Sequence, residues 1–295
     1  MKKISVIGAG TMGNGIAHCF AQKEFEVALV DLSIENLNNA KTTISKNLDR
    51  MIKKEIINLQ QKELIISRIS FQTELNDFVK NSDLIIEAVT ESKNVKIQIF
   101  KELDHLCKPE TILASNTSSI SINDIAKATN RQNNVIGMHF MNPVPIMKLI
   151  EVIKTNQTSE NTINKIMQLS TFLEKKPVLV NDFPGFVANR ILLPMINEAI
   201  QTLEDQVSGV SEIDTVMMLG MSHPMGPLQL ADFIGLDVCL SILEVLHDGL
   251  KHDKYKPNRL LIEMVEDGEL GVKSKQGFYN YENGIKNKIV NKRFT

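Results

Sequence analysis

Three polar residues at fixed spacings could move a proton onto or off an alcohol oxygen. They are Ser118, His139 and Glu151, which follows the histidine by twelve positions. Histidine ionises near neutral pH, and a carboxylate that holds one of its ring nitrogens leaves the other to exchange a proton with a substrate. If residues 147–153 are extended, Glu151 lies among apolar neighbours, where an unpaired carboxylate is costly. His139 is then its natural partner, although a surface strand with Glu151 in solvent fits the spacing equally well.

Two of the polar residues could hold a substrate oxygen or a cofactor amide. Ser118 follows a predicted strand, and open sheets bind ligands beyond the carboxyl ends of their strands. The residues alone favour a simpler role for Ser118, as a cap of a helix that begins near Ile120. Asn189 lies one turn into a predicted helix and could donate to a carbonyl oxygen as charge develops on it. The residue alone favours an ordinary place on the helix surface for Asn189.

A glycine-rich stretch near the start of the chain has the spacing of a dinucleotide-binding turn. It lies between a predicted strand at 4–7 and a predicted helix at 12–24, and consists of Gly8, Ala9, Gly10, Thr11, Met12 and Gly13. The free N–H groups at the helix start would face the phosphates. Asp31 ends the next predicted strand, 23 positions after Gly8, where a carboxylate bonds a ribose 2′-hydroxyl and repels a 2′-phosphate. The sequence therefore predicts NAD, with NADP disfavoured; a glycine turn without a ligand is the alternative.

The order of predicted elements indicates two domains. Apolar strands are expected at 4–7, 26–30, 83–89, 112–114, 135–140 and 177–184, and helical segments at 12–24, 34–66, 186–203, 211–218, 227–250 and 257–265. Strands that alternate with helices predict a Rossmann-like, doubly wound parallel sheet of the α/β class. After residue 184 only helical patterns remain. We therefore predict a nucleotide-binding domain at 1–184 and an all-helical domain at 185–295.

Composition and charge exclude several function classes. The 295 residues are 43% hydrophobic, with a formal net charge of −2, which argues against a nucleic-acid partner. The three cysteines are scattered, and no His/Cys cluster indicates a metal site. The sequence shows neither a signal peptide nor an apolar stretch long enough to cross a membrane, so we expect a cytoplasmic protein.

Several motifs together resemble those of the L-3-hydroxyacyl-CoA dehydrogenase family, especially its bacterial 3-hydroxybutyryl-CoA dehydrogenases. The likeness runs through essentially the whole chain, in family order. The motifs are the glycine-rich turn, Glu87-Ala88-Val89-Thr90-Glu91, Ser115-Asn116-Thr117-Ser118-Ser119, the stretch from His139 through Pro143 to Glu151, Pro184 to Arg190, His223-Pro224-Met225-Gly226-Pro227 and Gly277-Phe278-Tyr279.

The resemblance implies an activity and a set of site residues. It implies interconversion of 3-hydroxyacyl-CoA and 3-ketoacyl-CoA by hydride transfer to or from NAD, and a homodimer formed through the helical domain. His139 resembles the catalytic base, Glu151 its orienting carboxylate, and Ser118 and Asn189 the residues that hold the substrate oxygen. By motif position the resemblance also implies cofactor contacts at Glu91, Lys96, Ser118, Asn142 and Lys273, and a coenzyme A contact at Lys54.

Two departures and two rival functions remain open from the sequence. Met141 stands where phenylalanine is common, and Asn47 where some relatives have a serine near coenzyme A. A dehydrogenase of the same fold could act on free hydroxy acids, like an L-gulonate dehydrogenase of the lambda-crystallin type. A non-catalytic NAD-binding protein is the other rival, although such a protein would typically have lost His139 or Glu151.

Overall fold

The computed structural model describes residues 1–295 and divides them into two compact units, Met1–Phe183 and Pro184–Thr295. The first unit contains one sheet of eight strands. These strands are β1 (Lys3–Ile7), β2 (Glu26–Val30), β3 (Ile69–Gln72), β4 (Leu84–Glu87), β5 (Ile112–Ser115), β6 (Val135–Phe140), β7 (Leu149–Lys154) and β8 (Lys176–Asn181).

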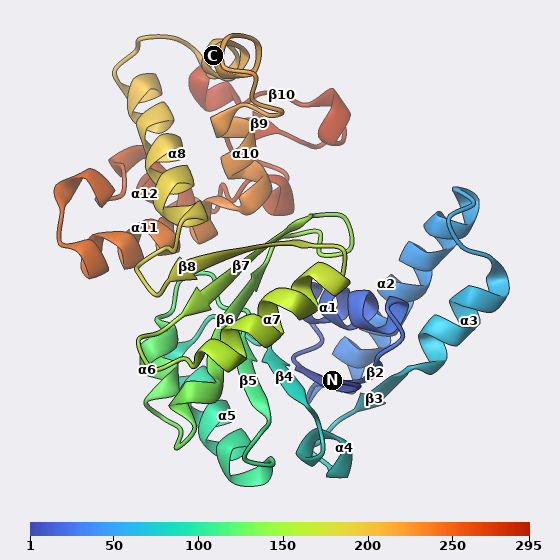
Figure 1. Cartoon of the computed structure of the whole chain (residues 1–295). Helices are drawn as coiled ribbons and strands as arrows, with labels where there is room; N and C mark the ends of the chain where they lie inside the picture. The colour runs from blue at the N-terminus through green and yellow to red at the C-terminus, as the bar shows by residue number, and fades with distance from the viewer. The chain divides into compact units, whose positions relative to one another are not determined.

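The strands follow the order β3-β2-β1-β4-β5-β6-β7-β8 (Figure 1). The six strands from β3 to β6 are parallel, in the 3-2-1-4-5-6 order of a doubly wound nucleotide-binding sheet. The predicted Rossmann-like sheet is therefore confirmed, but it is not parallel throughout. β7 runs antiparallel to β6, and β8 is parallel to β7. A short loop joins β6 to β7 without a helical crossover, and a parallel pair needs such a crossover.

Seven helices accompany the sheet: α1 (Thr11–Gln22), α2 (Ile34–Lys53), α3 (Leu59–Ser67), α4 (Asp77–Lys80), α5 (Lys93–Leu106), α6 (Ile122–Ala126) and α7 (Glu160–Phe172). The single helix predicted over 34–66 is wrong, because the chain breaks between α2 and α3. Glu55 has a positive φ of 56°, and Asn58 begins α3 with a capping box completed by Gln61. β3, α4, α5 and α7 had no counterpart among the predicted elements.

The main core of the first unit lies between one face of the sheet and helices α1, α2 and α7. Met138 and Phe140 of β6 and Ile150 and Val152 of β7 belong to that core. Because side chains alternate along a strand, the intervening His139 and Glu151 project from the other face. The alternation therefore separates the two polar side chains from the apolar core.

A buried histidine of the first unit has no hydrogen-bond partner. His18 of α1 is 1% exposed, and neither of its ring nitrogens is bonded. Burial, and then the nearby Lys175 ammonium, lower the pKa of His18 from 6.5 to about 4. The imidazole is therefore neutral in the folded protein at neutral pH.

Because of this lowered pKa, acid should weaken the fold through His18. The unfolded chain takes up a proton below pH 6.5 and the folded chain only near pH 4, so stability is full above pH 6.5 and is lost as the pH falls toward 4. At pH 5 the loss should be about 2 kcal/mol. Between pH 7.5 and pH 5, the free energy of unfolding of His18→Leu should fall by about 2 kcal/mol less than that of the wild type, measured by urea unfolding. Equal pH dependence in the two proteins would contradict this assignment.

The second unit is helical apart from a two-stranded ribbon. Its helices are α8 (Ala188–Glu204), α9 (Val210–Thr215), α10 (Pro227–Ile234), α11 (Leu236–Leu250) and α12 (Arg259–Glu266), with a π-helical segment at Val216–Gly220 and the strands β9 (Tyr279–Asn280) and β10 (Ile289–Val290). The helix predicted over 227–250 is two helices, since Gly235 between them has a φ of 102°. Short 3-10 turns lie at Gln132–Asn134, Asp253–Tyr255, Val272–Ser274, Ile285–Asn287 and Lys292–Phe294.

A buried carboxylate fastens the C-terminal segment to α10. Asp232 accepts hydrogen bonds from the backbone N–H groups of Phe278 and Tyr279 and from the Tyr281 hydroxyl, each at 2.9 Å. A side chain at Gly277 would overlap the Asp232 carboxylate. The Gly277-Phe278-Tyr279 motif therefore has a structural reason, which is the close approach of this segment to α10.

Candidate functional site

A hollow of about 720 Å³ lies at the carboxyl ends of the first strands of the sheet. The glycine-rich turn after β1, the end of β2 and the segment after β4 form its walls. Its lining includes Gly8, Gly10, Thr11, Met12, Asp31, Leu32, Asn36, Val89, Thr90 and Ile99. The hollow thus lies where open α/β sheets bind nucleotides.

The glycine-rich turn fits a dinucleotide. Gly8 has a φ of 104°, and a Cβ there would come within 2.6 Å of the Ala88 carbonyl oxygen. A Cβ at Gly13 would overlap the Gly8 carbonyl, so this glycine allows α1 to lie against the turn. At Gly10 nothing lies within 4 Å of the added Cβ, and no side chain caps α1. Space and unpaired backbone donors therefore coincide where a pyrophosphate would bind.

Asp31 is oriented by backbone donors at the end of β2. Its Oδ2 accepts from the N–H of Ala9 at 2.8 Å, and its Oδ1 accepts from the N–H of Ser33 at 2.9 Å. A carboxylate oxygen can accept more than one hydrogen bond, so both oxygens can still accept from ribose hydroxyls. The side chain lines the hollow, as the predicted ribose contact requires.

A buried ion pair lies beside the hollow. Lys96 is 1% exposed, and its Nζ lies 2.6 Å from Oε1 of the fully buried Glu87. Ser115 Oγ donates to the other oxygen of Glu87, Oε2, at 2.6 Å, and the N–H of Val89 donates to Oε1 at 2.8 Å. Sequence reasoning gave Glu87 no role of its own. The available signal was an acid at the end of an apolar strand, where an unpaired charge is unstable.

Ser118 belongs to a cluster organised by Glu91. Oε1 of Glu91 accepts from Thr117 Oγ1 at 2.6 Å, from the N–H of Ser118 at 2.9 Å and from Ser118 Oγ at 3.2 Å, while its Oε2 lies 3.3 Å from Lys96 Nζ. Burial alone would raise the Glu91 pKa, but Lys96 and the hydroxyl and N–H donors outweigh it and lower that pKa. Helix α6 is capped by Ser121, so the simpler cap role for Ser118 is wrong.

His139 and Glu151 are directly opposite each other on adjacent antiparallel strands. His139 Nδ1 lies 2.8 Å from Glu151 Oε2, with the histidine 8% and the glutamate 2% exposed. A carboxylate can only accept, so this bond assigns the Nδ1–H tautomer and leaves Nε2 as the basic atom of the neutral ring. The alternative, in which Glu151 meets solvent, is wrong. The pair has the composition and geometry of a proton-transfer group with its orienting acid.

The other predicted site residues belong to the β6–β7 loop, to α2 and to the helical unit. Asn142 follows β6 at the start of the loop to β7 and is exposed. Lys54 is an exposed residue at the C-terminal cap of α2. Asn189 and Lys273 belong to the helical unit: Asn189 is a buried residue in the first turn of α8, and Lys273 Nζ donates to Asp237 Oδ2 at 2.6 Å.

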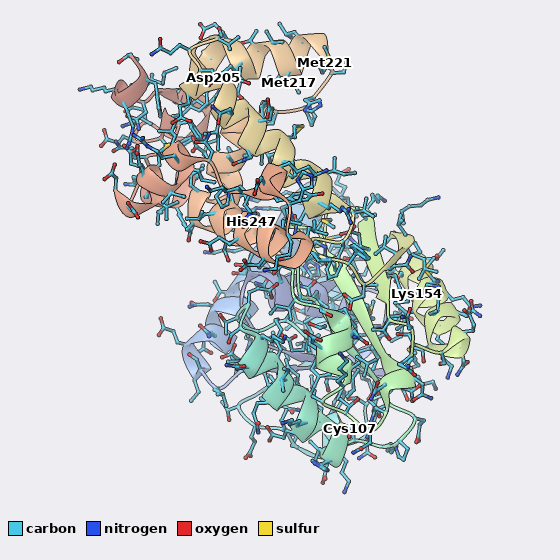
Figure 2. The ribbon with its side chains drawn as sticks, turned by 90° about the vertical axis from the view of Figure 1, so that its left-hand side faces the viewer. Cys107, Lys154, Asp205, Met217, Met221 and His247 are labelled. Atoms are coloured by element: carbon cyan, nitrogen blue, oxygen red, sulfur yellow. The ribbon has the colours of Figure 1, made fainter.

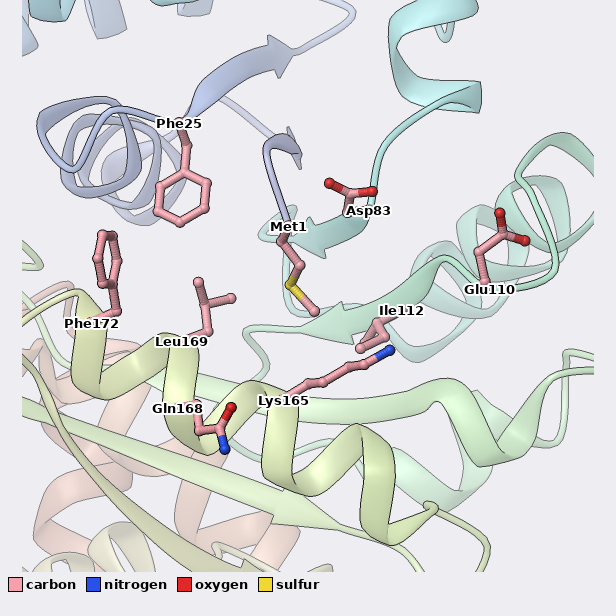
Figure 3. A pocket seen from close by; sticks show the side chains of 9 residues that line it. All are labelled: Met1, Phe25, Asp83, Glu110, Ile112, Lys165, Gln168, Leu169 and Phe172. Carbon is pink, nitrogen blue, oxygen red and sulfur yellow. The ribbon is translucent and has the colours of Figure 1, made fainter.

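A second hollow, of about 580 Å³, lies at the amino ends of the strands, opposite the first hollow (Figure 3). Its walls include Met1, Asp83 and Ile112, which lie at the amino ends of β1, β4 and β5, together with Leu169 and Phe172 of α7. Since Gly8 and Ser118 follow the carboxyl ends of β1 and β5, this hollow is remote from the predicted cofactor and substrate residues.

Comparisons with known proteins agree with this geometry. Residues 3–183 match the family model described as 3-hydroxyacyl-CoA dehydrogenase, NAD binding domain, and residues 185–281 match the one described as 3-hydroxyacyl-CoA dehydrogenase, C-terminal domain. The chain belongs to the 3-hydroxyacyl-CoA dehydrogenase family. The family predicted from the motifs is therefore confirmed, and so is the prediction of an NAD-binding enzyme.

Individual relatives of this family cover nearly the whole chain. The 3-hydroxybutyryl-CoA dehydrogenase of Bradyrhizobium diazoefficiens is 50% identical over 95% of this chain and 96% of its own. The human mitochondrial hydroxyacyl-coenzyme A dehydrogenase is 40% identical over 96% of this chain and 92% of its own. The crystal structure of (S)-3-hydroxybutyryl-CoA dehydrogenase from Ralstonia eutropha superposes with a TM-score of 0.92 at 44% identity, covering 96% and 99% of the two chains. None of the helices in this chain meets the length and apolarity of a membrane span.

Proposed function

We propose that this enzyme interconverts (S)-3-hydroxyacyl-CoA and 3-ketoacyl-CoA with NAD, and that four-carbon substrates are among those it turns over. The observation that carries the proposal is the 2.8 Å bond between His139 Nδ1 and Glu151 Oε2 in a chain of this family. The inclusion of four-carbon substrates rests on relatives near 50% identity that are named 3-hydroxybutyryl-CoA dehydrogenases.

In this mechanism His139 moves the proton. During oxidation, Nε2 of the neutral ring takes the proton of the substrate 3-hydroxyl; during reduction the imidazolium returns it to the 3-oxygen. Glu151 keeps the ring in the Nδ1–H tautomer and offsets the positive charge that forms on it. NAD, when bound, supplies the hydride acceptor or donor. Ser118 and Asn189 would fix the substrate oxygen by hydrogen bonds, which remains a prediction for both residues.

Asp31 should set the choice between the two nicotinamide cofactors. Its carboxylate would bond the ribose 2′-hydroxyl of NAD. In NADP a 2′-phosphate takes the place of that hydroxyl, and juxtaposed like charges cost several kcal/mol. We expect Asp31→Ser to change the ratio of kcat/KM for NADH to that for NADPH by roughly 100-fold toward NADPH. Glu35→Ser, which removes an exposed acid from the first turn of α2, is the control and should leave the ratio unchanged. An unaltered ratio in Asp31→Ser would refute the assignment.

The helical unit is proposed to pair with a second copy. Apolar side chains are exposed in the π-helical segment and at the residue that ends it: Val216 is 61%, Leu219 81% and Met221 61% exposed. Figure 2 labels Met217 in this segment and Met221 directly after it, and Met217 also lines an apolar hollow of about 350 Å³. Exposed apolar patches of this kind mark protein–protein contacts. Sedimentation of the wild type should give twice the chain mass, and Leu219→Glu should give the mass of one chain.

The proposal also includes a reducing compartment such as the cytoplasm. Cys19, Cys107 and Cys239 are all buried free thiols, which supports an environment in which disulfides do not form. Detection of the native protein in a fractionated cell would test the compartment directly.

The decisive experiment follows NADH absorbance with 3-ketoacyl-CoA substrates from C4 to C16 and with free acetoacetate. Turnover of acetoacetyl-CoA without turnover of acetoacetate supports the proposed function. Preference for the free acid would instead favour the hydroxy-acid dehydrogenase alternative. Binding of NADH without turnover of any of these substrates would favour the non-catalytic alternative.

A further inference from the structure

One cation outside the predicted site holds the loop that joins β6 to β7. Lys175 Nζ donates to the carbonyl oxygen of Val144 at 2.6 Å and to that of Met147 at 2.8 Å. Both acceptors lie in the loop 141–148, which begins directly after the strand of His139 and ends just before the strand of Glu151. Asn142 lies near the start of the same loop.

The backbone of Lys175 is itself held in place by a helix-ending motif. Glu174 has a φ of 58°; its N–H donates to the Thr171 carbonyl, and the N–H of Lys175 donates to the Ser170 carbonyl. This is the Schellman pattern at the end of α7. The next residue joins β8, since the N–H of Lys176 donates to the Lys148 carbonyl at 2.7 Å. The ammonium therefore extends toward the loop from a fixed base.

The surroundings of Lys175 give its charge no carboxylate partner. The neighbouring Glu174 pairs with Lys23 at 2.5 Å, and no carboxylate lies within ion-pair distance of Lys175. Burial, with the neighbouring Lys148, lowers the Lys175 pKa despite the opposing effects of Cys19 and Glu174. The imidazole of His18 nearby is neutral, so it adds no repulsion at neutral pH. The hydrogen bonds that the ammonium makes are therefore to the loop carbonyls.

We propose that Lys175 is a positioning residue, whose ammonium fixes the loop 141–148 and thereby the placement of Asn142 relative to the His139–Glu151 pair. The inference rests on the proposed function for its catalytic readout. An ammonium carries three donors on one atom, so the single Nζ can bond two carbonyls of one loop. A guanidinium holds its donors in a rigid plane on separate nitrogens. Small misplacements of groups that must meet a substrate lower the rate strongly.

The test compares Lys175→Met with Lys176→Met, which removes the exposed lysine one position later. We expect Lys175→Met to lower kcat for acetoacetyl-CoA reduction roughly 10- to 100-fold. Its affinity for ADP-ribose should stay within about two-fold, because the glycine-rich turn is untouched. Amide hydrogen exchange in 141–148 should quicken in this variant only. A normal kcat, or a lowered kcat with unchanged exchange in this loop, would overturn the proposal.

A rescue experiment separates positioning from a general loss of structure. Lys175→Cys treated with 2-bromoethylamine regains an ammonium of nearly the same reach, and the native thiols are protected because burial raises the pKa of Cys19, Cys107 and Cys239. Recovery of kcat and of slow exchange in the modified protein supports the proposal, and modification without recovery overturns it. If the wild type itself fails to reduce acetoacetyl-CoA, the proposed function fails, while the exchange comparison still tests the loop contact.

Discussion

His139→Gln should lower kcat for acetoacetyl-CoA reduction by roughly 1000-fold, within the range that general acid–base catalysis contributes. Glutamine can still donate from its side-chain amide to Glu151, so the buried carboxylate keeps a partner. It has no group that can gain or lose a proton at neutral pH. The loss should therefore fall on the chemical step, measured as kcat at saturating NADH and substrate.

Two controls make the His139 result specific. The Kd for NADH should change by less than about three-fold, because the hollow lined by the glycine-rich turn and Asp31 does not include His139. His105→Gln, on an exposed position of α5, should keep wild-type kcat. Turnover of His139→Gln within ten-fold of the wild type would rule out this residue as the proton-transfer group.

Lys96→Met should produce the largest loss of stability, about 3–5 kcal/mol, since it leaves the Glu87 charge buried without its cation. The midpoint of thermal unfolding should fall by about 10 °C for a loss of this size in a chain of this length. Calorimetry or circular dichroism at pH 7.5 measures it. The reason is the desolvation of Glu87, which has no solvent exposure and is stabilised at 2.6 Å by the ammonium.

A double variant and a surface variant separate the effect of the pair from that of a lost lysine. Adding Glu87→Gln to Lys96→Met removes the unpaired charge and keeps an acceptor for Ser115 Oγ, so most of the lost stability should return. Lys93→Met, on the same helix as Lys96, breaks an exposed pair with Asp124 of α6 and should cost less than about 1 kcal/mol. A double variant as unstable as Lys96→Met would show that the charge of Glu87 is not the cause.

Much of the first unit could be predicted from local patterns. The strands that hold Ile4–Ile7, Val27–Val30 and Leu84–Ile86 are apolar runs ended by glycine or an acid, and such runs are typical of buried parallel strands. Short or weakly patterned elements could not be predicted. β3 is only four residues long, and its first residue alone is buried.

The residues of the site also differ in how far the sequence predicts their contacts. The glycine-rich turn and Asp31 have a fixed local spacing, so the sequence was enough to place them at one end of the sheet. The sequence alone did not predict the contacts between segments that are distant along the chain. The bond from Thr117 to Glu91, and the pairing of Glu87 with Lys96, depend on how β4, β5 and α5 pack together. Ser118 was open to misinterpretation for this reason, because its partner lies 27 positions away.

The reversal of direction between β6 and β7 sets a limit on how this enzyme can be altered. His139 and Glu151 share one rung of an antiparallel ladder, so added residues in the loop 141–148 need not separate them. Removing a single residue from within β7 is different. It would bring Ile150 or Val152 opposite the imidazole and turn the acid toward the apolar core. The register of β6 and β7 in this protein therefore cannot be changed without breaking the His139–Glu151 pair, whereas the length of the connection between them does not set that pairing.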